Sequence, residues 1–311
     1  MREKRKPVPL TIITGFLGSG KTTLINYMLA DLGGKEKLAI VKNEIGDVAV
    51  DSKIIRGKNI VLRELLNGCV CCTIIGTLED SLEELVNMVH PDRIIIETSG
   101  AANPAILAVN IDRMPFVKRD LIVTVIDCVH FAGYKDRTTV ARLQHAFTDL
   151  VVLNRVGEVD DETIERVLDD VYEQRPGIPS VKTETGRVYP DVLFGTTVKR
   201  LPSEDLAGGI ADSKHLDHDG IEAFSFVSKE RVNRAVLEGT LEYLSDEFFR
   251  VKGFVHFVGE EHLMLLNWVC GRLEIEDVQE VSENETKLLF IGKRISSYRD
   301  SVVKRISGVG N

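Results

Sequence analysis

Short apolar runs alternate with amphipathic stretches from residue 8 to about residue 200. The runs are rich in β-branched residues and almost continuously apolar, as in strands that are buried on both faces. They predict strands over residues 8–14, 37–43, 59–65, 92–98, 120–127 and 149–154. Strands that alternate with helices predict an α/β fold, with a mostly parallel sheet and helices on both of its faces.

Two of the intervening stretches have the spacing of helices. Apolar residues in 77–89 recur every three or four positions, which places them on one helix face. The same pattern runs through 160–174. There it follows Asp160 and Asp161, and acidic residues suit the positive end of a helix. Both stretches are therefore predicted helices that pack against the sheet.

The pattern changes after a polar, glycine-rich stretch at 204–219, which is typical of a linker. It separates a predicted first domain, 1–203, from a second, 220–311. The second domain has a helical face over 231–249 and a helical stretch at 296–306. Its apolar runs predict strands over 222–228, 249–258, 262–269 and 285–295. These elements predict a smaller α+β domain with an antiparallel sheet.

Composition excludes several classes of function. The chain has 39 Lys and Arg against 48 Asp and Glu, a net charge of −9, whereas nucleic-acid binding relies on a basic surface. No apolar run approaches the roughly 18 residues of a membrane span. The apolar segment after the basic N-terminus is too short for a signal peptide. We therefore expect a cytoplasmic globular protein with neither a nucleic-acid nor a membrane partner.

A phosphate-binding loop follows the first predicted strand. Residues 15–22 read G-x-x-x-x-G-K-T, between a strand and an apolar helix start, as this motif requires. The glycines let backbone N–H groups surround phosphate oxygens. Lys21 is placed to reach the β- and γ-phosphates, and the Thr22 hydroxyl to ligate Mg²⁺. The candidate nucleotide-binding residues here are Gly15, Gly18, Ser19, Gly20, Lys21, Thr22 and Thr23.

A second candidate site lies at the end of the strand predicted at 92–98. Glu97 stands at its carboxyl end, where an acidic side chain can hold Mg²⁺ directly or through water. The N–H of Gly100 is a candidate donor to the γ-phosphate. An alternative role for Thr98 or Ser99 is to cap the following helix. We predict that Lys21, Thr22 and Glu97 together form the catalytic set.

The strand predicted at 149–154 ends in Asn154 and Arg155, where GTPases carry N-K-x-D. The aspartate of that motif accepts hydrogen bonds from two N–H groups of guanine and so excludes adenine. Here Gly157 takes the aspartate position, and Glu158 follows one residue late. Asn154 and Arg155 are candidate nucleotide-binding residues, and the stem of Arg155 can cover the base. The motif alone predicts weaker discrimination of GTP from ATP.

Three of the five cysteines, Cys69, Cys71 and Cys72, lie within four positions. Thiolates are soft ligands that suit Zn²⁺ and similar metals. The alternatives are a redox site, since clustered thiols of low pKa are reactive, or small buried side chains. Cys128 and Cys270 lie in apolar segments and are predicted to be core residues.

The order of these motifs resembles that of the CobW-type GTPases, which join a SIMIBI-class P-loop GTPase domain to a CobW C-terminal domain. The resemblance covers nearly the whole chain. The segments that carry it are GFLGSGKTTL (15–24), NEIGDVAVD (43–51), ELLNGCVCCT (64–73), ETSGAANP (97–104) and VIDC (125–128). The glycine at 157 is the main departure from the family pattern.

The resemblance implies a role in metal trafficking. It makes Cys69, Cys71 and Cys72 the metal ligands, and it makes segment 43–51 a nucleotide-dependent switch. Glu44 and Asp47 in that segment are further candidate metal ligands. Family members often carry a histidine-rich linker. Here it is reduced to His215 and His218 with neighbouring aspartates, which is typical of a solvated linker.

We therefore expect a GTPase that uses GTP and Mg²⁺, binds Zn²⁺ or alternatively Co²⁺, and delivers the metal to a metal-requiring client protein. A second copy of the chain is a further candidate partner, as a homodimer. One alternative is a nucleotide-binding zinc storage or sensing module with negligible turnover. Another is a P-loop small-molecule kinase, although no arginine-rich lid is evident and the cysteines would then be idle.

Overall fold

The computed structural model describes residues 6–32, 36–42, 60–64, 75–98, 104–131, 147–194, 221–245, 247–277 and 285–308. The chain divides into two compact units, residues 1–190 and 191–311. The predicted linker 204–219 lies outside the described residues, so the predicted domain boundaries remain a prediction.

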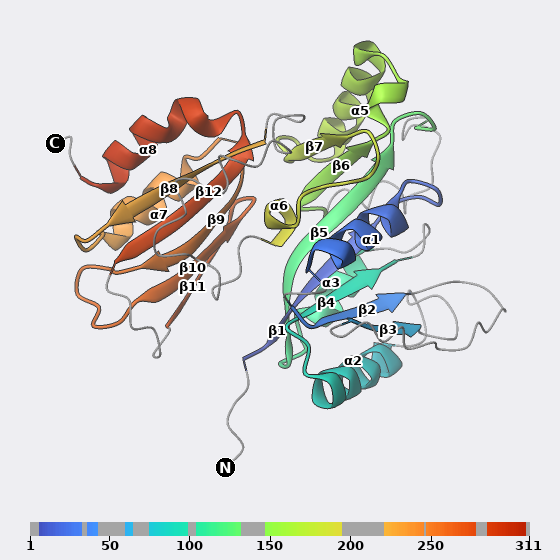
Figure 1. Ribbon diagram of the computed structural model, residues 1–311, viewed down its shortest axis with the longest axis horizontal. Helices are drawn as coiled ribbons and strands as arrows, with labels where there is room; N and C mark the ends of the chain where they lie inside the picture. The colour runs from blue at the N-terminus through green and yellow to red at the C-terminus, as the bar shows by residue number, and fades with distance from the viewer. Residues whose placement is uncertain are drawn as a thin grey trace. The chain divides into compact units, whose positions relative to one another are not determined.

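The first unit contains a seven-stranded parallel sheet in the order β3-β2-β4-β1-β5-β6-β7 (Figure 1). Its strands are β1 (Val8–Thr14), β2 (Leu38–Lys42), β3 (Ile60–Glu64), β4 (Arg93–Glu97), β5 (Val117–Asp127), β6 (Leu150–Asn154) and β7 (Ser180–Thr183). In β1, Ile12 and Ile13 point to opposite faces and both are fully buried, so the sheet is covered on both sides. The predicted α/β class is confirmed.

Helices follow most of these strands. They are α1 (Lys21–Leu32), α2 (Ile75–Val89), α3 (Pro104–Ile111) and α5 (Asp161–Gln174), with a 3₁₀ turn η1 (Val156–Glu158). A short helix, α6 (Pro190–Phe194), lies where the chain passes from the first unit to the second. Leu82 of α2 and Ile111 of α3 pack with Ile12 and Ile122 of the sheet in one buried cluster. The predicted start of α5 is confirmed, because Asp160 caps the helix by accepting a hydrogen bond from the Thr163 N–H (2.8 Å).

Two features of this sheet differ from the sequence prediction. Strand β5 begins at Val117 rather than at residue 120, because Val117 to Arg119 already pair with β1. Strand β7 was not predicted, since its four residues are too few to show a hydrophobic pattern. It is recognisable only through its pairing with β6.

The second unit contains a five-stranded antiparallel sheet in the order β11-β10-β9-β12-β8. Its strands are β8 (Ile221–Ser228), β9 (Phe248–Val255), β10 (Met264–Val269), β11 (Arg272–Asp277) and β12 (Thr286–Lys293). They are accompanied by α7 (Arg234–Glu242), η3 (Ile295–Tyr298) and α8 (Arg299–Ile306). Phe224 and Phe290 stack at 4.8 Å between ring centroids within the core. The predicted α+β class of this part is confirmed.

Two predictions for this unit were wrong, and one strand was missed. The helical face predicted over 231–249 is too long: α7 ends at Glu242, and Phe248 is buried because it begins β9. Strand β11 was not predicted, because this edge strand is partly exposed and mostly polar. Cys270 lies in the turn after β10 and is only half-buried.

Candidate functional site

The loop from β1 to α1 has a backbone that requires glycine at two positions. Gly15 and Gly20 adopt φ angles of 136° and 104°. A side chain on Gly15 would collide with the Val125 carbonyl, and one on Gly20 would collide with the Asn154 amide. Gly18 also has a positive φ, 81°, but no neighbour within 4 Å of where its Cβ would lie. The loop is therefore held closely against the ends of β5 and β6.

Lys21 lies at the first position of α1, and its side chain turns back into the loop. Its Nζ donates hydrogen bonds to the carbonyl oxygens of Gly15 (2.8 Å) and Phe16 (2.9 Å). Burial lowers the pKa of Lys21, while the negative charge of Glu97 raises it in part. Within the described part of the chain, the acceptors around this cation are thus neutral carbonyl oxygens, and an anion would be a stronger partner for it.

Thr22 and Glu97 meet where the sequence predicted a magnesium site. The Thr22 hydroxyl donates to Glu97 Oε1 at 2.8 Å, and Lys42 Nζ lies 3.9 Å from Glu97 Oε2. They come together because β4 pairs with β1 and β2 on either side, with Glu97 level with Ile13 and Lys42. A hydroxyl and a carboxylate are hard oxygen donors, so this pair fits Mg²⁺.

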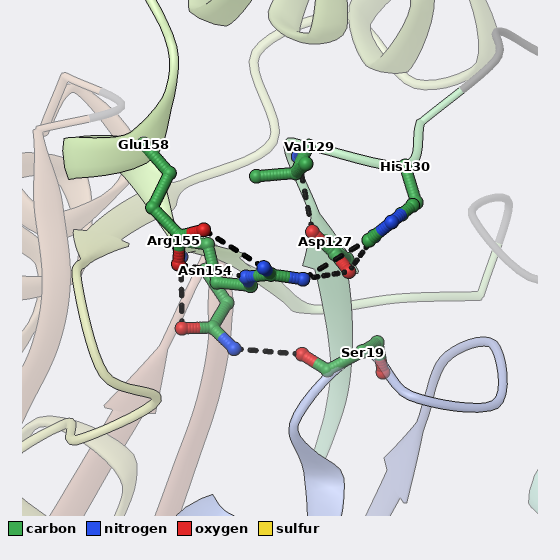
Figure 2. A network of polar contacts seen from close by, with 7 residues as sticks. All are labelled: Ser19, Asp127, Val129, His130, Asn154, Arg155 and Glu158. Carbon is green, nitrogen blue, oxygen red and sulfur yellow. Dashed lines mark hydrogen bonds and ion pairs between the residues drawn. The ribbon is translucent and has the colours of Figure 1, made fainter.

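Asn154 ties the end of β6 to the phosphate loop. Its buried amide donates from Nδ2 to the Ser19 carbonyl at 2.8 Å, and its Oδ1 accepts from the Arg155 N–H at 2.9 Å (Figure 2). Ser19 is itself buried, and its backbone makes this contact. In this arrangement Asn154 holds the shape of the loop.

Arg155 lies at the centre of a polar network in Figure 2. Its Nε and Nη2 donate to the two carboxylate oxygens of Glu158 at 2.9 and 2.8 Å, and its Nη1 donates to Asp127 Oδ2 at 3.1 Å. His130 Nδ1 lies 2.8 Å from the same Asp127 oxygen, and the Val129 N–H donates to Oδ1. The head of Arg155 is thus held by two carboxylates, and its aliphatic stem remains available to a base.

These contacts shift the acidity of both carboxyl groups. Burial disfavours the ionised form of Asp127, but the hydrogen bonds from His130 and Val129 and the charge of Arg155 outweigh it, and the pKa of Asp127 is lowered. The hydrogen bonds from Arg155 also lower the pKa of Glu158. Next to Asp127, burial and the aspartate charge raise the pKa of Cys128 to about 11, which keeps this thiol protonated.

The loop after β7 also lies at this site, and sequence reasoning missed it. The Thr183 hydroxyl closes the loop by donating to the Arg187 carbonyl and accepting from the Arg187 N–H, both at 3.1 Å. Gly186 adopts a φ of 70°, and a Cβ there would lie 3.5 Å from Thr23 and 3.6 Å from the Asn154 amide. Asp127 was also missed, although an acidic residue at a strand's carboxyl end is the signal that identified Glu97.

Several predicted site residues lie outside the described residues. They are Glu44, Asp47, Cys69, Cys71, Cys72, Gly100 and the linker residues His215 and His218. Within the described ranges, no three His, Cys, Asp or Glu side chains are grouped so that they could hold a metal ion. Among the helices of the described part, none is long and apolar enough to cross a membrane.

The chain matches known families along most of its length. Residues 9–182 match the family described as CobW/HypB/UreG, nucleotide-binding domain, and residues 221–307 match the cobalamin synthesis protein cobW C-terminal domain. A relative from Sinorhizobium sp, named zinc chaperone CobW, is 29% identical over 88% of both chains. Its namesake from Pseudomonas aeruginosa is 30% identical over 93% of this chain and 88% of its own. The crystal structure of Zn(II)-bound YjiA GTPase from E. coli aligns with 99% of this chain and 100% of its own, at 22% identity and a TM-score of 0.47.

Proposed function

Because the chain belongs to the CobW/HypB/UreG family of nucleotide-binding proteins, we propose that it is a metal chaperone that binds and hydrolyses GTP. Its cargo is Zn²⁺, with Co²⁺ as the alternative, and it hands this metal to a client protein that requires it. The observation that carries the nucleotide half is the arrangement of Lys21 and the Thr22–Glu97 pair at the carboxyl ends of β1 and β4. The relatives named zinc chaperone support the metal half.

The phosphate loop supplies binding and charge neutralisation. In the proposed complex, Lys21 exchanges its carbonyl partners for oxygens of the β- and γ-phosphates. The N–H groups of the loop and of the first turn of α1 surround the same phosphates, where the helix dipole favours negative charge. Phosphoryl transfer needs mainly this positioning and stabilisation of charge, with little covalent chemistry from the protein.

Thr22 and Glu97 would hold the magnesium ion of the nucleotide complex, Thr22 through its hydroxyl and Glu97 directly or through water. Bound there, Mg²⁺ supplies further neutralisation of phosphate charge. Lys42, which lies near the far oxygen of Glu97, balances the carboxylate charge in the absence of the ion. The direct contact between Thr22 and Glu97 keeps the two ligands together.

The metal cargo binds to the thiolates of Cys69, Cys71 and Cys72, with Glu44 and Asp47 as candidate additional ligands. Support for this part comes from the softness of thiolates and the spacing of the three cysteines. The cysteines follow β3, and the candidate switch segment 43–51 follows β2, its neighbour in the sheet. This common edge supports a coupling between nucleotide and metal.

A turnover assay tests the enzymatic half. Release of inorganic phosphate from GTP is measured with Mg²⁺, with and without Zn²⁺, for the wild type and for Lys21→Ala. We expect the variant to lose about 100-fold or more in rate, because the phosphates lose their main protein cation. Lys229→Ala, at an exposed lysine of the second unit, is the matched control and should match the wild type.

Two outcomes would contradict the proposal. Equal turnover in Lys21→Ala and in the wild type would mean that the loop does not carry the reaction. Tight GTP binding without turnover, both with and without Zn²⁺, would indicate a nucleotide-binding zinc storage or sensing module in place of a GTPase.

A further inference from the structure

We propose that Glu184, in the loop after β7, supplies the carboxylate that recognises guanine in place of the aspartate missing at position 157. The inference rests on the proposed function, because it takes the nucleotide to be GTP. It assigns the choice of base to a residue that is distant along the chain from the motif in which that carboxylate is expected.

The side chain of Glu184 fills the space beside Gly157. A Cβ on Gly157 would lie 3.3 Å from both Cγ and Cδ of Glu184, and 3.4 Å from its Oε1. The carboxyl group of Glu184 therefore stands next to the backbone position from which an aspartate side chain would otherwise extend. Both residues are exposed, so this carboxyl group remains accessible to a ligand.

The loop that carries Glu184 is held against the nucleotide site. Thr183 and Arg187 close it through two hydrogen bonds, and Gly186 faces Thr23 of α1 closely enough that an added Cβ would lie 3.5 Å from the Thr23 side chain. The Arg187 guanidinium lies 6.0 Å from the ring centroid of Tyr27, also on α1. Since α1 begins in the phosphate loop, a nucleotide bound there would bring its base to the Glu184 loop.

Glu158, the other nearby glutamate, is already engaged. Both of its oxygens accept hydrogen bonds from Arg155, as Figure 2 shows. Turning Glu158 toward a base would break this two-pronged ion pair. The carboxylate of Glu184 has no hydrogen bond or ion pair to any other residue in the described part of the chain. Glu184 therefore recognises a base without losing an existing contact.

The chemistry of the base distinguishes the nucleotides. The N1–H and the exocyclic amino group of guanine are adjacent donors that match the two oxygens of a carboxylate. Adenine presents an acceptor at N1, which a carboxylate repels. Xanthine keeps the N1–H but has a carbonyl in place of the amino group. A glutamine amide, with one acceptor and one donor, therefore suits xanthine better than guanine.

The experiment measures affinities of non-hydrolysable GTP, ATP and XTP analogues for the wild type and for Glu184→Gln. We expect the variant to lose about 10- to 100-fold in GTP affinity, as for loss of a charged acceptor. It should bind XTP more tightly than the wild type does. Glu162→Gln, at an exposed glutamate in the first turn of α5, is the matched control and should change neither affinity.

A carboxylate exchange provides an independent test. In Glu184→Ala combined with Gly157→Asp, the acceptor returns to the motif position, and the truncation removes the crowding at Gly157. We expect this double variant to regain most of the GTP preference that Glu184→Ala alone loses. Recovery would show that the position of the carboxylate matters, whereas damage to the loop would not be repaired from position 157.

The outcomes separate this inference from the proposed function. Guanine preference that is unchanged in Glu184→Gln, or that falls further in Glu158→Gln, would overturn the role of Glu184 and leave the GTPase proposal intact. A wild type that binds GTP and ATP equally would also overturn it. Failure of the wild type to bind any of the three nucleotides would instead overturn the proposed function.

Discussion

The candidate site has a phosphate end, formed by the loop at residues 15–22, and a base end, formed by Asp127, Arg155 and Glu158. The two ends are held in shape by different kinds of contact. At the phosphate end, Gly15 and Gly20 adopt backbone conformations that a side chain would disrupt, and Lys21 is enclosed by carbonyl groups of its own loop. At the base end, Asp127, Arg155 and Glu158 are joined side chain to side chain. One end depends on backbone shape, and the other depends on side-chain charge.

This difference explains why the motif is complete at one end and altered at the other. A backbone cradle needs particular residues at fixed positions, because a displaced glycine would change the shape of the whole loop. A carboxylate acceptor needs only to reach the base, and any segment that the fold brings there can provide it. Small substitutions at the phosphate end should therefore reduce nucleotide affinity strongly, whereas substitutions at the base end should reduce it only moderately.

The largest effect is expected from Gly15→Ala, compared with Gly18→Ala. Both residues have positive φ, which costs a non-glycine residue roughly 1–2 kcal/mol, but only at Gly15 would the new methyl group collide with a backbone carbonyl. We expect a greater loss of unfolding free energy in Gly15→Ala, and a loss of nucleotide affinity of about 100-fold. Urea unfolding without nucleotide measures the loss of stability, and equilibrium binding measures the loss of nucleotide affinity. Equal losses of stability would mean that crowding against β5 does not shape the loop.

An intermediate effect is expected from Glu97→Gln. The amide keeps the size of the side chain and its contact with Thr22, but it is a weaker ligand for Mg²⁺ than a carboxylate. Turnover should need about 10-fold more Mg²⁺, because loss of a charged acceptor weakens binding by this order. A magnesium titration of GTP turnover measures the shift, with Glu162→Gln as the control. An unchanged magnesium requirement would remove Glu97 from the predicted site.

The smallest effect is expected from Asp127→Asn. Arg155 keeps its two bonds to Glu158 in this variant, so nucleotide affinity should fall by only a few-fold. This modest loss is expected if substitutions at the base end reduce nucleotide affinity only moderately. A loss as large as that in Gly15→Ala would contradict the contrast between the two ends.

The same variant has a predictable pH dependence. The pKa of Asp127 is lowered in the folded protein. Near pH 4 and below, this residue is therefore protonated to a greater extent in the unfolded chain than in the folded protein. Its contribution to stability is therefore complete above about pH 4 and is lost as the pH falls through the folded pKa. Urea unfolding from pH 7 to pH 3 should show a steeper loss for the wild type than for Asp127→Asn. Parallel curves would contradict the lowered pKa.

The strand–loop–helix segment that carries the phosphate-binding motif could be predicted from the sequence for a physical reason. Phosphate binding by backbone N–H groups requires adjacent residues in a strand–loop–helix order, and both the motif and its order are visible in the chain. Glu97 was predicted because it ends a continuously apolar run. The contact between Thr22 and Glu97, however, depends on β4 lying beside β1, which only the sheet topology shows.

The base end was less predictable because its residues come from three separate strand ends. Strand β7 is too short to leave a pattern, so the loop that holds Glu184 had no sequence signal. The proximity of Glu184 to Gly157 results from the pairing of Asn154 with Thr183 at the ends of β6 and β7. In the second unit, the helix predicted over 231–249 was too long for a related reason. Phe248 continues the helical spacing of apolar residues but is buried as part of a strand.

Control of metal affinity by the nucleotide state can be measured in a single calorimetric comparison. Zn²⁺ is titrated into the protein bound to GDP and into the protein bound to a non-hydrolysable GTP analogue, with the triple Cys69, Cys71 and Cys72 to Ser variant as control. If the two sites are coupled, zinc binds about 5- to 150-fold more tightly with the GTP analogue, and the triple variant loses both tight binding and coupling. Equal zinc affinity in the two nucleotide states would contradict this coupling.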